Sequence, residues 1–323
     1  MERTKRRERT AYACVTAAVL LLLLLTAGTA IATSAGRARP GTAIWHPALH
    51  SRWQYQLTGD SAYPATGGVN VDICQRSYQG GACARPEVFD IDLYADAAVT
   101  GDNGTLNTAA VRAIHANGAR AICYVDAGGI EKGRPDYRRF AEWDDAHGHS
   151  LIGKPYPGFP DESYANINND RGQRDFLLDA QGARVRACAR AGFDGVEFDV
   201  VNAYEDGRAV TGWSISATTQ LEYNRALADL AHRHGLSAAL KNDLGQIPRL
   251  VSWFDYAVNE QCFQYAECGN LALFVSAGKP VFQVEYSRPP SRFCPKATTT
   301  WNFNAIKKGG DARLTDLPYT PCR

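Results

Sequence analysis

Strand-like and helix-like segments alternate along the chain after residue 50. Amphipathic segments at 107–118, 173–192 and 217–235 have apolar residues at helical spacing, and each ends in a Gly suited to the position after a helix. Short apolar runs typical of buried strands occur at eight places: 53–57, 88–94, 121–126, 164–168, 195–200, 237–242, 256–262 and 281–286. Eight strand-then-helix units predict an α/β fold of the (β/α)8 or TIM barrel type. A doubly wound open sheet is the alternative, but no GxGxxG follows the first strand.

The N-terminal residues differ in character from the rest. A basic stretch, MERTKRRERT, precedes the apolar run AYACVTAAVLLLLLLTAG and a small-residue site at 30–32. This order is typical of a secretory signal peptide, so we predict a signal over 1–32. An uncleaved membrane anchor is the alternative, because the run is long enough to span a bilayer. We expect an exported protein with a linker or arm at 33–50 and one barrel domain at 51–323.

Cysteine usage and charge narrow the class of protein. Of nine cysteines, Cys14 lies in the apolar run, and the remaining even number suits disulfides in an oxidising compartment. The candidate pairs close in sequence are Cys74–Cys83, Cys262–Cys268 and Cys294–Cys322, which leaves Cys123 and Cys188 to pair or to stay buried. No cysteines have zinc-site spacing. The formal net charge of +1 gives no indication of a nucleic-acid partner, and we expect a monomer.

Acidic residues gather at the ends of the predicted strands. In GVEFDV, Glu197 and Asp199 are two positions apart, so both side chains point to the same face of an extended chain. Six of the eight predicted strands end in an acid and only one in a base, Lys241; the acids are Asp90, Asp92, Asp126, Glu197, Asp199, Asp243, Glu260 and Glu285. The functional end of such a barrel is the C-terminal edge of its strands. A structural role is as plausible for any single acid, but the set predicts an acid-lined mouth.

The chemistry must use carboxylates, because none of the seven histidines lies at a predicted strand end. Two possibilities remain: glycoside hydrolysis by two carboxylates, and an all-oxygen Mg²⁺ or Ca²⁺ site. Aromatic side chains favour a sugar, since flat apolar faces stack on pyranose rings. Tyr204, Trp213 and Tyr286 are the candidates, with Trp213 in the polar loop AVTGWSIS the strongest. For Trp53 and Tyr124, core packing is as well supported.

In these segments the chain resembles glycoside hydrolase family 114, the endo-α-1,4-polygalactosaminidase barrel family. The similarity runs in order through 53–287 and is carried by WQYQLTG, VFDIDLY, ICYVDAGGIEKGRPD, GFDGVEFDVVNAY, QLEYNRALADLAHRHGLSAALKND, AVNEQCFQYAEC and GKPVFQVEY. One departure is VEFDVVNAY, where the family usually reads more like VEPDNVDGY. The acids Glu197 and Asp199 are kept, while Phe198, Val200 and Asn202 replace Pro, Asn and Asp.

The resemblance implies a secreted or surface-bound hydrolase of α-1,4-linked galactosamine polymers, without a cofactor or metal. An amino sugar is cationic near neutral pH, and an acid-lined mouth is complementary to it. Asp199 and Glu260, on facing walls of the barrel, are the expected nucleophile and acid/base. The expected substrate-binding residues are Asp92, Asp126, Glu197, Tyr204, Trp213, Lys241, Asp243, Glu285 and Tyr286. Two alternatives stay open: a non-catalytic carbohydrate-binding barrel, and a divalent-metal enzyme using Asp92, Asp126 and Asp199.

Overall fold

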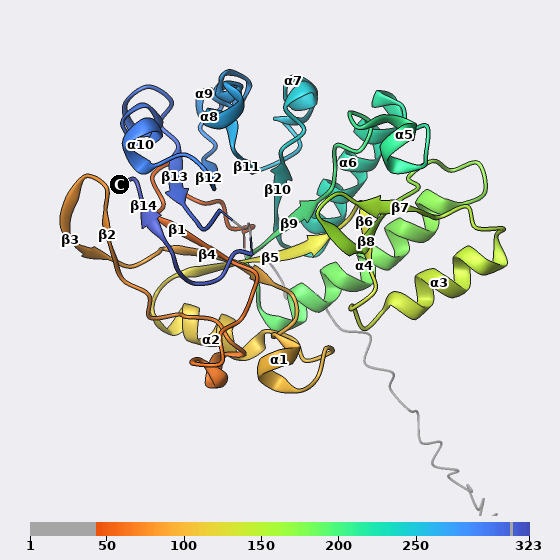
Figure 1. The fold of residues 1–323 in the computed structure, drawn as a ribbon, viewed down its shortest axis with the longest axis horizontal. Coiled ribbons are helices and arrows are strands. Elements are labelled where there is room, and N and C mark those ends of the chain that lie inside the picture. The colour runs from red at the N-terminus through yellow and green to blue at the C-terminus, as the bar shows by residue number, and fades with distance from the viewer. Residues whose placement is uncertain (1–42, 311–312) are drawn as a thin grey trace, which may run out of the picture. The chain divides into compact units, whose positions relative to one another are not determined.

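The computed structural model describes residues 43–310 and 313–323, which form a curved parallel sheet surrounded by helices (Figure 1). The sheet order is β1-β4-β5-β9-β10-β11-β12-β13-β14, and all neighbours are parallel except β13 and β14. The strands are β1 (Trp53–Gln56), β4 (Val88–Asp92), β5 (Arg120–Asp126), β9 (Gly195–Asp199), β10 (Ser237–Lys241), β11 (Tyr256–Glu260), β12 (Val281–Glu285), β13 (Asn304–Lys307) and β14 (Thr320–Pro321). The prediction of a (β/α)8 barrel is confirmed.

Helices cover the outside of this sheet. The three predicted helices are confirmed as α2, α4 and α6, and Gly118, Gly192 and Gly235 follow them with positive φ. The described α-helices are α1 (Ala97–Thr100), α2 (Thr108–Ala116), α3 (Tyr137–Ala146), α4 (Gln173–Ala191), α5 (Gly207–Thr211), α6 (Ala217–Arg233), α7 (Ile247–Leu250), α8 (Cys262–Tyr265), α9 (Ala272–Ser276) and α10 (Pro290–Thr299). Short 3-10 turns lie at Pro64–Thr66, Leu244–Gln246 and Cys268–Leu271, and a two-stranded hairpin is formed by β2 (Gln75–Ser77) and β3 (Gly80–Ala84).

The barrel closes where β1 meets β13. The indole N–H of Trp53 donates to the Asn304 carbonyl at 2.8 Å, and the Tyr319 hydroxyl donates to the Trp53 carbonyl at 2.8 Å. The Trp53 ring packs against Tyr55 and Phe282, with ring centroids 5.3 and 5.2 Å away. Trp53 is 1% exposed, so its role is core packing and closure of the barrel.

One of the predicted strands is wrong, and one strand of the barrel was not predicted. The segment predicted at 164–168 is not a barrel strand, because β5 pairs directly with β9 in parallel register, with Asp126 opposite Asp199. The eighth parallel strand is instead β13. Its sequence, NAIK, is short and is followed by Lys308, so it lacks the apolar run that marks a buried strand. The structure accommodates Lys308 by burying its ammonium against Gln54 and backbone carbonyls.

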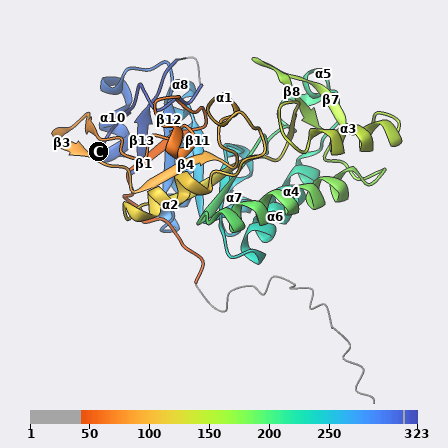
Figure 2. The same cartoon turned by 90° about the horizontal axis from the view of Figure 1, so that it is seen from below.

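The residues between β5 and α4 form a separate three-stranded antiparallel sheet. Its strands are β6 (Gly129–Glu131), β8 (Phe159–Ala165) and β7 (Ile152–Tyr156), in the order β6-β8-β7. Figures 1 and 2 place this sheet beside α3 and α5. Gly128 allows the chain to leave the barrel here, since a Cβ at that position would lie 1.8 Å from the Val200 carbonyl oxygen. The three-stranded sheet therefore rises from the C-terminal ends of β5 and β9.

Four disulfides are present: Cys74–Cys83, Cys123–Cys188, Cys262–Cys268 and Cys294–Cys322. The three predicted pairs are confirmed, and the remaining two cysteines also pair, joining β5 to α4. The predicted signal at 1–32 lies outside the described residues. At the described end of the arm, Trp45 packs edge-on against Tyr256 with centroids 6.4 Å apart. Within the described residues, no helix is long and apolar enough to cross a bilayer.

The disulfides should differ in their effect on stability. Replacing both cysteines of Cys123–Cys188 by alanine is expected to lower the free energy of unfolding more than the same change at Cys74–Cys83. The bonds span 65 and 9 residues, and a cross-link constrains the unfolded chain more when the loop is longer, by about 4 against about 2.5 kcal/mol. Urea unfolding of the two double variants measures this. Equal losses, or a larger loss for the short loop, would contradict it.

Candidate active site

A buried lysine lies at the centre of the barrel mouth. Lys241, the last residue of β10, is 2% exposed, and its ammonium nitrogen contacts three carboxylates: Asp199 Oδ1 at 3.1 Å, Glu197 Oε1 at 3.3 Å and Glu260 Oε2 at 3.4 Å. Burial alone would lower the pKa of Lys241, but Asp199, Glu260 and Glu197 outweigh it and raise that pKa well above its usual value. We call these four residues the Lys241 cluster. They come from β9, β10 and β11.

Each carboxylate of the cluster also accepts a hydrogen bond from a tyrosine. Tyrosine hydroxyls are strong donors to ionised carboxylates, and such bonds favour the charged form. The three bonds run from Tyr55 to Glu197 Oε1 at 3.0 Å, from Tyr124 to Asp199 Oδ2 at 2.9 Å and from Tyr286 to Glu260 Oε1 at 2.5 Å. The predicted residue Tyr286 therefore lies in the cluster through its hydroxyl. For Tyr124 the sequence supported an aromatic face or core packing equally and missed the hydroxyl contact, and the hydroxyl contact of Tyr55 was missed as well.

Asp199 is held in its charged form. Burial favours the neutral acid, but the Lys241 ammonium, the Val200 N–H at 2.8 Å and the Tyr124 hydroxyl outweigh it and lower the pKa of Asp199. Val200 has φ 55°, a left-handed conformation that a β-branched residue rarely adopts. This turn aims the Val200 N–H back at the carboxylate. The Asp199 side chain is 22% exposed and so can be reached by a substrate.

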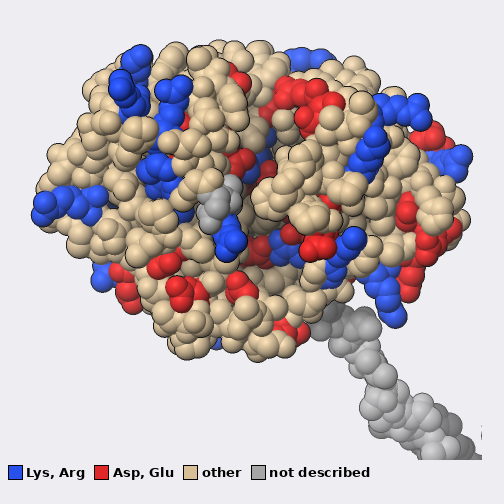
Figure 3. Space-filling model, viewed as in Figure 1, with Lys and Arg blue, Asp and Glu red and all other residues tan. Residues whose placement is uncertain are grey.

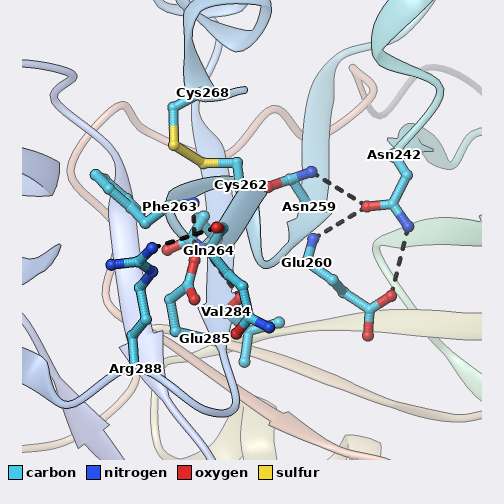
Figure 4. The surroundings of a disulfide bond; sticks show 11 residues. Asn242, Asn259, Glu260, Cys262, Phe263, Gln264, Cys268, Val284, Glu285 and Arg288 are labelled. Carbon is cyan, nitrogen blue, oxygen red and sulfur yellow. Dashed lines mark hydrogen bonds between the residues drawn. A yellow bond between two sulfur atoms is a disulfide. The ribbon is translucent and has the colours of Figure 1, made fainter. Parts of the chain in front are cut away.

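Glu260 is positioned by asparagine side chains that sequence reasoning missed (Figure 4). The Asn242 side-chain Nδ2 donates to Glu260 Oε2 at 3.4 Å, and the Asn242 side-chain Oδ1 accepts the Glu260 backbone N–H at 3.0 Å. Asn259 donates to the same Asn242 oxygen at 3.2 Å. Asn242 has φ 47°, a left-handed conformation that suits asparagine. An asparagine directly after β10 could therefore have indicated a functional turn there. The Glu260 side chain is 28% exposed.

Glu197 lies deeper than the other two carboxylates. It is 0% exposed, and burial raises its pKa, with the Lys241 ammonium acting in the opposite direction. Below it lies Asp90, also 0% exposed, whose pKa is raised well above its usual value by burial and then by the charge of Glu197. No donor in the described residues reaches either Asp90 oxygen. Asp90 therefore lies beside Glu197 inside the barrel, where burial disfavours its charged form.

Asp92 and Asp126 belong to the mouth but not to the Lys241 cluster. Asp92 accepts from Arg134 at 2.6 Å, and the same guanidinium binds Glu131 at 2.5 Å. Asp126 accepts the Gly129 N–H at 2.6 Å through one oxygen. Burial and the nearby carboxylates, first of all Glu162, raise the pKa of Asp126 well above its usual value. Sequence reasoning missed Arg134, Glu131 and Glu162, which come from the segment that leaves the barrel.

Glu285 does not face the mouth, contrary to expectation. It is 0% exposed and accepts the Phe263 N–H at 2.9 Å and the Gln283 amide at 2.8 Å. Figure 4 shows its carboxylate beside the Cys262–Cys268 loop, turned away from that of Glu260. Side chains alternate between the two faces of a strand, so Glu285 points to the opposite face from Val284, which is the helix side of β12. Its role is to anchor α8.

Asp243, Tyr204 and Trp213 also lie outside the cluster. Asp243 follows the turn at Asn242, has φ 45° and accepts from Asn224 of α6 at 2.8 Å and from Tyr204 at 3.3 Å. Burial raises the pKa of Asp243 to about 8, with Glu205 adding to the shift. The Trp213 indole nitrogen is buried beside Gly153 of β7, so this ring supports the three-stranded sheet. The expectation that Asp243 joins the other strand-end acids is wrong, because the left-handed turn redirects it.

A cleft of about 420 Å³ opens beside the cluster, between the start of α1 and the three-stranded sheet. Figure 3 shows Asp and Glu side chains around a hollow in this face of the molecule. Its wall includes Asp92, Tyr94, Glu131, Arg134, Phe159 and Glu162. In the part of the chain that the structure describes, no three Asp, Glu, His or Cys side chains are grouped as metal ligands. The point where the cluster's carboxylates converge holds an ammonium group.

This arrangement provides what a two-carboxylate hydrolase requires. Asp199 and Glu260 are the accessible members of the cluster and approach Lys241 from different strands. Their facing oxygens are separated by no more than the sum of the 3.1 Å and 3.4 Å contacts to the ammonium. Retaining glycosidases place their carboxyl groups about 5–5.5 Å apart and inverting enzymes about 6.5–9.5 Å. The limit is compatible with the shorter spacing.

Known proteins resemble this chain in sequence and in fold. The model of glycoside-hydrolase family GH114 matches residues 34–316, and no curated protein sequence matches significantly. Ega3 of Aspergillus fumigatus, solved with galactosamine, superposes with a TM-score of 0.64 at 26% identity, over 85% of this chain and 97% of that chain. The glycoside hydrolase domain of PelA from Pseudomonas aeruginosa gives 0.50 at 15% identity, over 82% and 96%, which supports the fold alone. The resemblance seen in the sequence is confirmed: the chain belongs to glycoside-hydrolase family GH114 and is a glycoside hydrolase.

Proposed function

We propose that this protein is a secreted hydrolase that cleaves within chains of α-1,4-linked galactosamine, with Asp199 as nucleophile and Glu260 as acid/base. The observation that carries the proposal is the Lys241 cluster, in which two accessible carboxylates are held near one another on a single ammonium. Asp199 suits the nucleophile because its pKa is lowered, so that it is charged at neutral pH. Glu260 suits proton transfer because its side chain is 28% exposed and lies close to Asp199; the two come from β11 and β9, on either side of β10, and not from facing walls of the barrel as expected.

In this mechanism the first step breaks the glycosidic bond. Glu260 reacts from its protonated form. It gives its proton to the leaving oxygen while the Asp199 carboxylate attacks the anomeric carbon, which forms a glycosyl–enzyme ester and leaves Glu260 as the carboxylate that contacts Lys241 in the ligand-free structure. Glu260, now a carboxylate, then takes a proton from water, which attacks the same carbon and releases Asp199. Lys241 and Tyr124 keep Asp199 oriented, and Asn242 keeps Glu260 oriented. The proximity of the two carboxylates on one ammonium is compatible with this retaining course.

The charge of the mouth supports an amino-sugar substrate. Glu197, Asp199 and Glu260 share one lysine, and further acids line the adjacent cleft, so the site attracts cations. Ega3, which this chain resembles, was solved with galactosamine. The four disulfides support export, since such bonds persist in oxidising compartments. We propose that the signal-like sequence at 1–32 directs this export. It would be either a cleaved signal peptide or an uncleaved anchor that holds the barrel outside the cell.

The proposal is tested by hydrolysis of deacetylated galactosaminogalactan. The wild type should release oligosaccharides, and Asp199→Asn and Glu260→Gln should each lose about 10³-fold or more of the rate, since each removes a group that reacts. Matched controls are Asp145→Asn and Glu142→Gln, whose side chains are 75% and 67% exposed on α3; both should keep wild-type rates. Product size is measured by mass spectrometry, and the anomer first released by NMR.

Four results would count against this assignment. No release of oligosaccharide by the wild type, or full activity in both active-site variants, would remove the proposed function. Polymer that is retained by the protein but never shortened would indicate a carbohydrate-binding barrel instead. Inversion of the anomeric configuration would leave the hydrolase assignment in place but would exclude Asp199 as a nucleophile.

Lys241→Met should impair both stability and catalysis. Without the ammonium, three carboxylates share a buried site, and losing one partner of such a network typically costs about 3–5 kcal/mol. Burial already raises the pKa of Glu197 and the Lys241 ammonium opposes this, so in the variant that pKa should rise further above the unfolded value; stability is then retained below about pH 4 and lost as pH rises through the raised folded value. Urea unfolding between pH 4 and 8 measures this, with the exposed Lys154→Met as control. A penalty independent of pH would contradict the account.

A further inference from the structure

The cleft beside the Lys241 cluster has features that the proposed reaction does not use. Neither Asp199 nor Glu260 contributes to its wall. One side is formed by the three-stranded sheet, where Phe159 of β8 is 50% exposed and Glu162 of the same strand lines the cleft. A small recess of about 10 Å³ shares Tyr94, Glu131 and Arg134 with it and has Asp126 in its wall.

Two carboxyl groups in this region each have one oxygen that no hydrogen-bond donor reaches. Asp126 is 1% exposed, and no donor in the described residues reaches its Oδ2; the same holds for Oε1 of Glu162. Both oxygens lie on one side of Gly129, 2.0 and 2.6 Å from the position that a Cβ there would occupy. Two carboxyl oxygens at such close range repel unless a proton or a cation lies between them. A proton shared by the pair, or a cation bound in its place, removes this repulsion, so the pair can accept a positive group from a ligand.

The strand register adds a second unfavourable contact that a cation would relieve. Glu131 of β6 lies directly opposite Glu162 of β8 in the antiparallel ladder. Like charges in this position destabilise a sheet. Burial raises the pKa of Glu162 to about 7, and Asp199 and Glu131 add to the shift. The cation already present, Arg134, binds Asp92 and Glu131, so its charge is used within the wall.

We propose that this cleft is a subsite for a further galactosamine unit of the polymer and that Glu162 binds its ammonium group. The inference rests on the proposed function for the identity of the polymer, but it concerns a different set of residues. Phe159 offers the sugar an exposed aromatic face, as saccharide sites commonly do. The ammonium would lie between Glu162 and Glu131, above Asp126. An N-acetylated unit carries no charge and would leave these carboxyl groups unpaired.

The test measures binding of α-1,4-linked galactosamine oligosaccharides and of their N-acetylated counterparts to Asp199→Asn protein by calorimetry. The free-amine ligand should bind more tightly. Adding Glu162→Gln should weaken it about tenfold, the value of one charge-assisted hydrogen bond, and leave the acetylated ligand unchanged. Adding Phe159→Ala should weaken both ligands by the same factor, because stacking does not depend on the amine. Glu142→Gln is the matched control.

The outcomes separate this inference from the proposed function. If Glu162→Gln leaves the preference for the free amine intact, or weakens both ligands equally, the subsite assignment is wrong whatever the hydrolysis results show. If the wild type fails to hydrolyse the polymer but the preference still disappears in Glu162→Gln, the subsite stands and the hydrolase proposal does not. Circular dichroism of Glu162→Gln, compared with that of Phe159→Ala, verifies that the loss is not one of folding.

Discussion

The ammonium group of Lys241 is the constraint on which the mouth of the barrel depends. Three carboxylates from β9 and β11 meet within 3.4 Å of one nitrogen that is almost wholly buried. Taking these charges out of water costs several kcal/mol for each ion, and the carboxylates would repel one another without the lysine. One tyrosine hydroxyl donates to each of these carboxylates, so each acid has a defined orientation. Stability and reactivity are therefore set by the same contacts.

The parallel register of the sheet explains how this cluster forms. Tyr124 lies opposite Glu197 and Asp126 lies opposite Asp199 across β5 and β9. Alternation of side chains then sends all four to one face of the barrel wall. The next strand, β10, brings Lys241 to the same level, and the left-handed turn after it places Asn242 against Glu260. Both residues of this turn have positive φ, and as a result Asn242 contacts Glu260 while Asp243 contacts Asn224 of α6.

Much of this could be predicted from the sequence, and the physical reason is periodicity. Two-residue spacing placed Glu197 and Asp199 on one face, and strand ends indicated Lys241 and Glu260. The same reasoning was wrong for Glu285, because it assumed that every strand-end acid points inward, and for Asp243, because the turn cannot be recognised from strand pattern. Glu162 and Arg134 lie in the segment between β5 and α4 that leaves the barrel. Tertiary contacts alone bring them to the mouth, so no local signal marked them.

A titration of the side-chain carboxyl groups by ¹³C NMR tests the central role of Lys241 most directly. If the Lys241 ammonium holds the cluster together, Asp199 in the ligand-free protein should titrate below the ordinary aspartate pKa of about 3.9, and Glu197 should titrate above its ordinary value. Lys241 should stay protonated throughout the neutral range. An Asp199 pKa at or above the ordinary value, or loss of the Lys241 proton near pH 7, would contradict the claim that this ammonium holds the carboxylates in place.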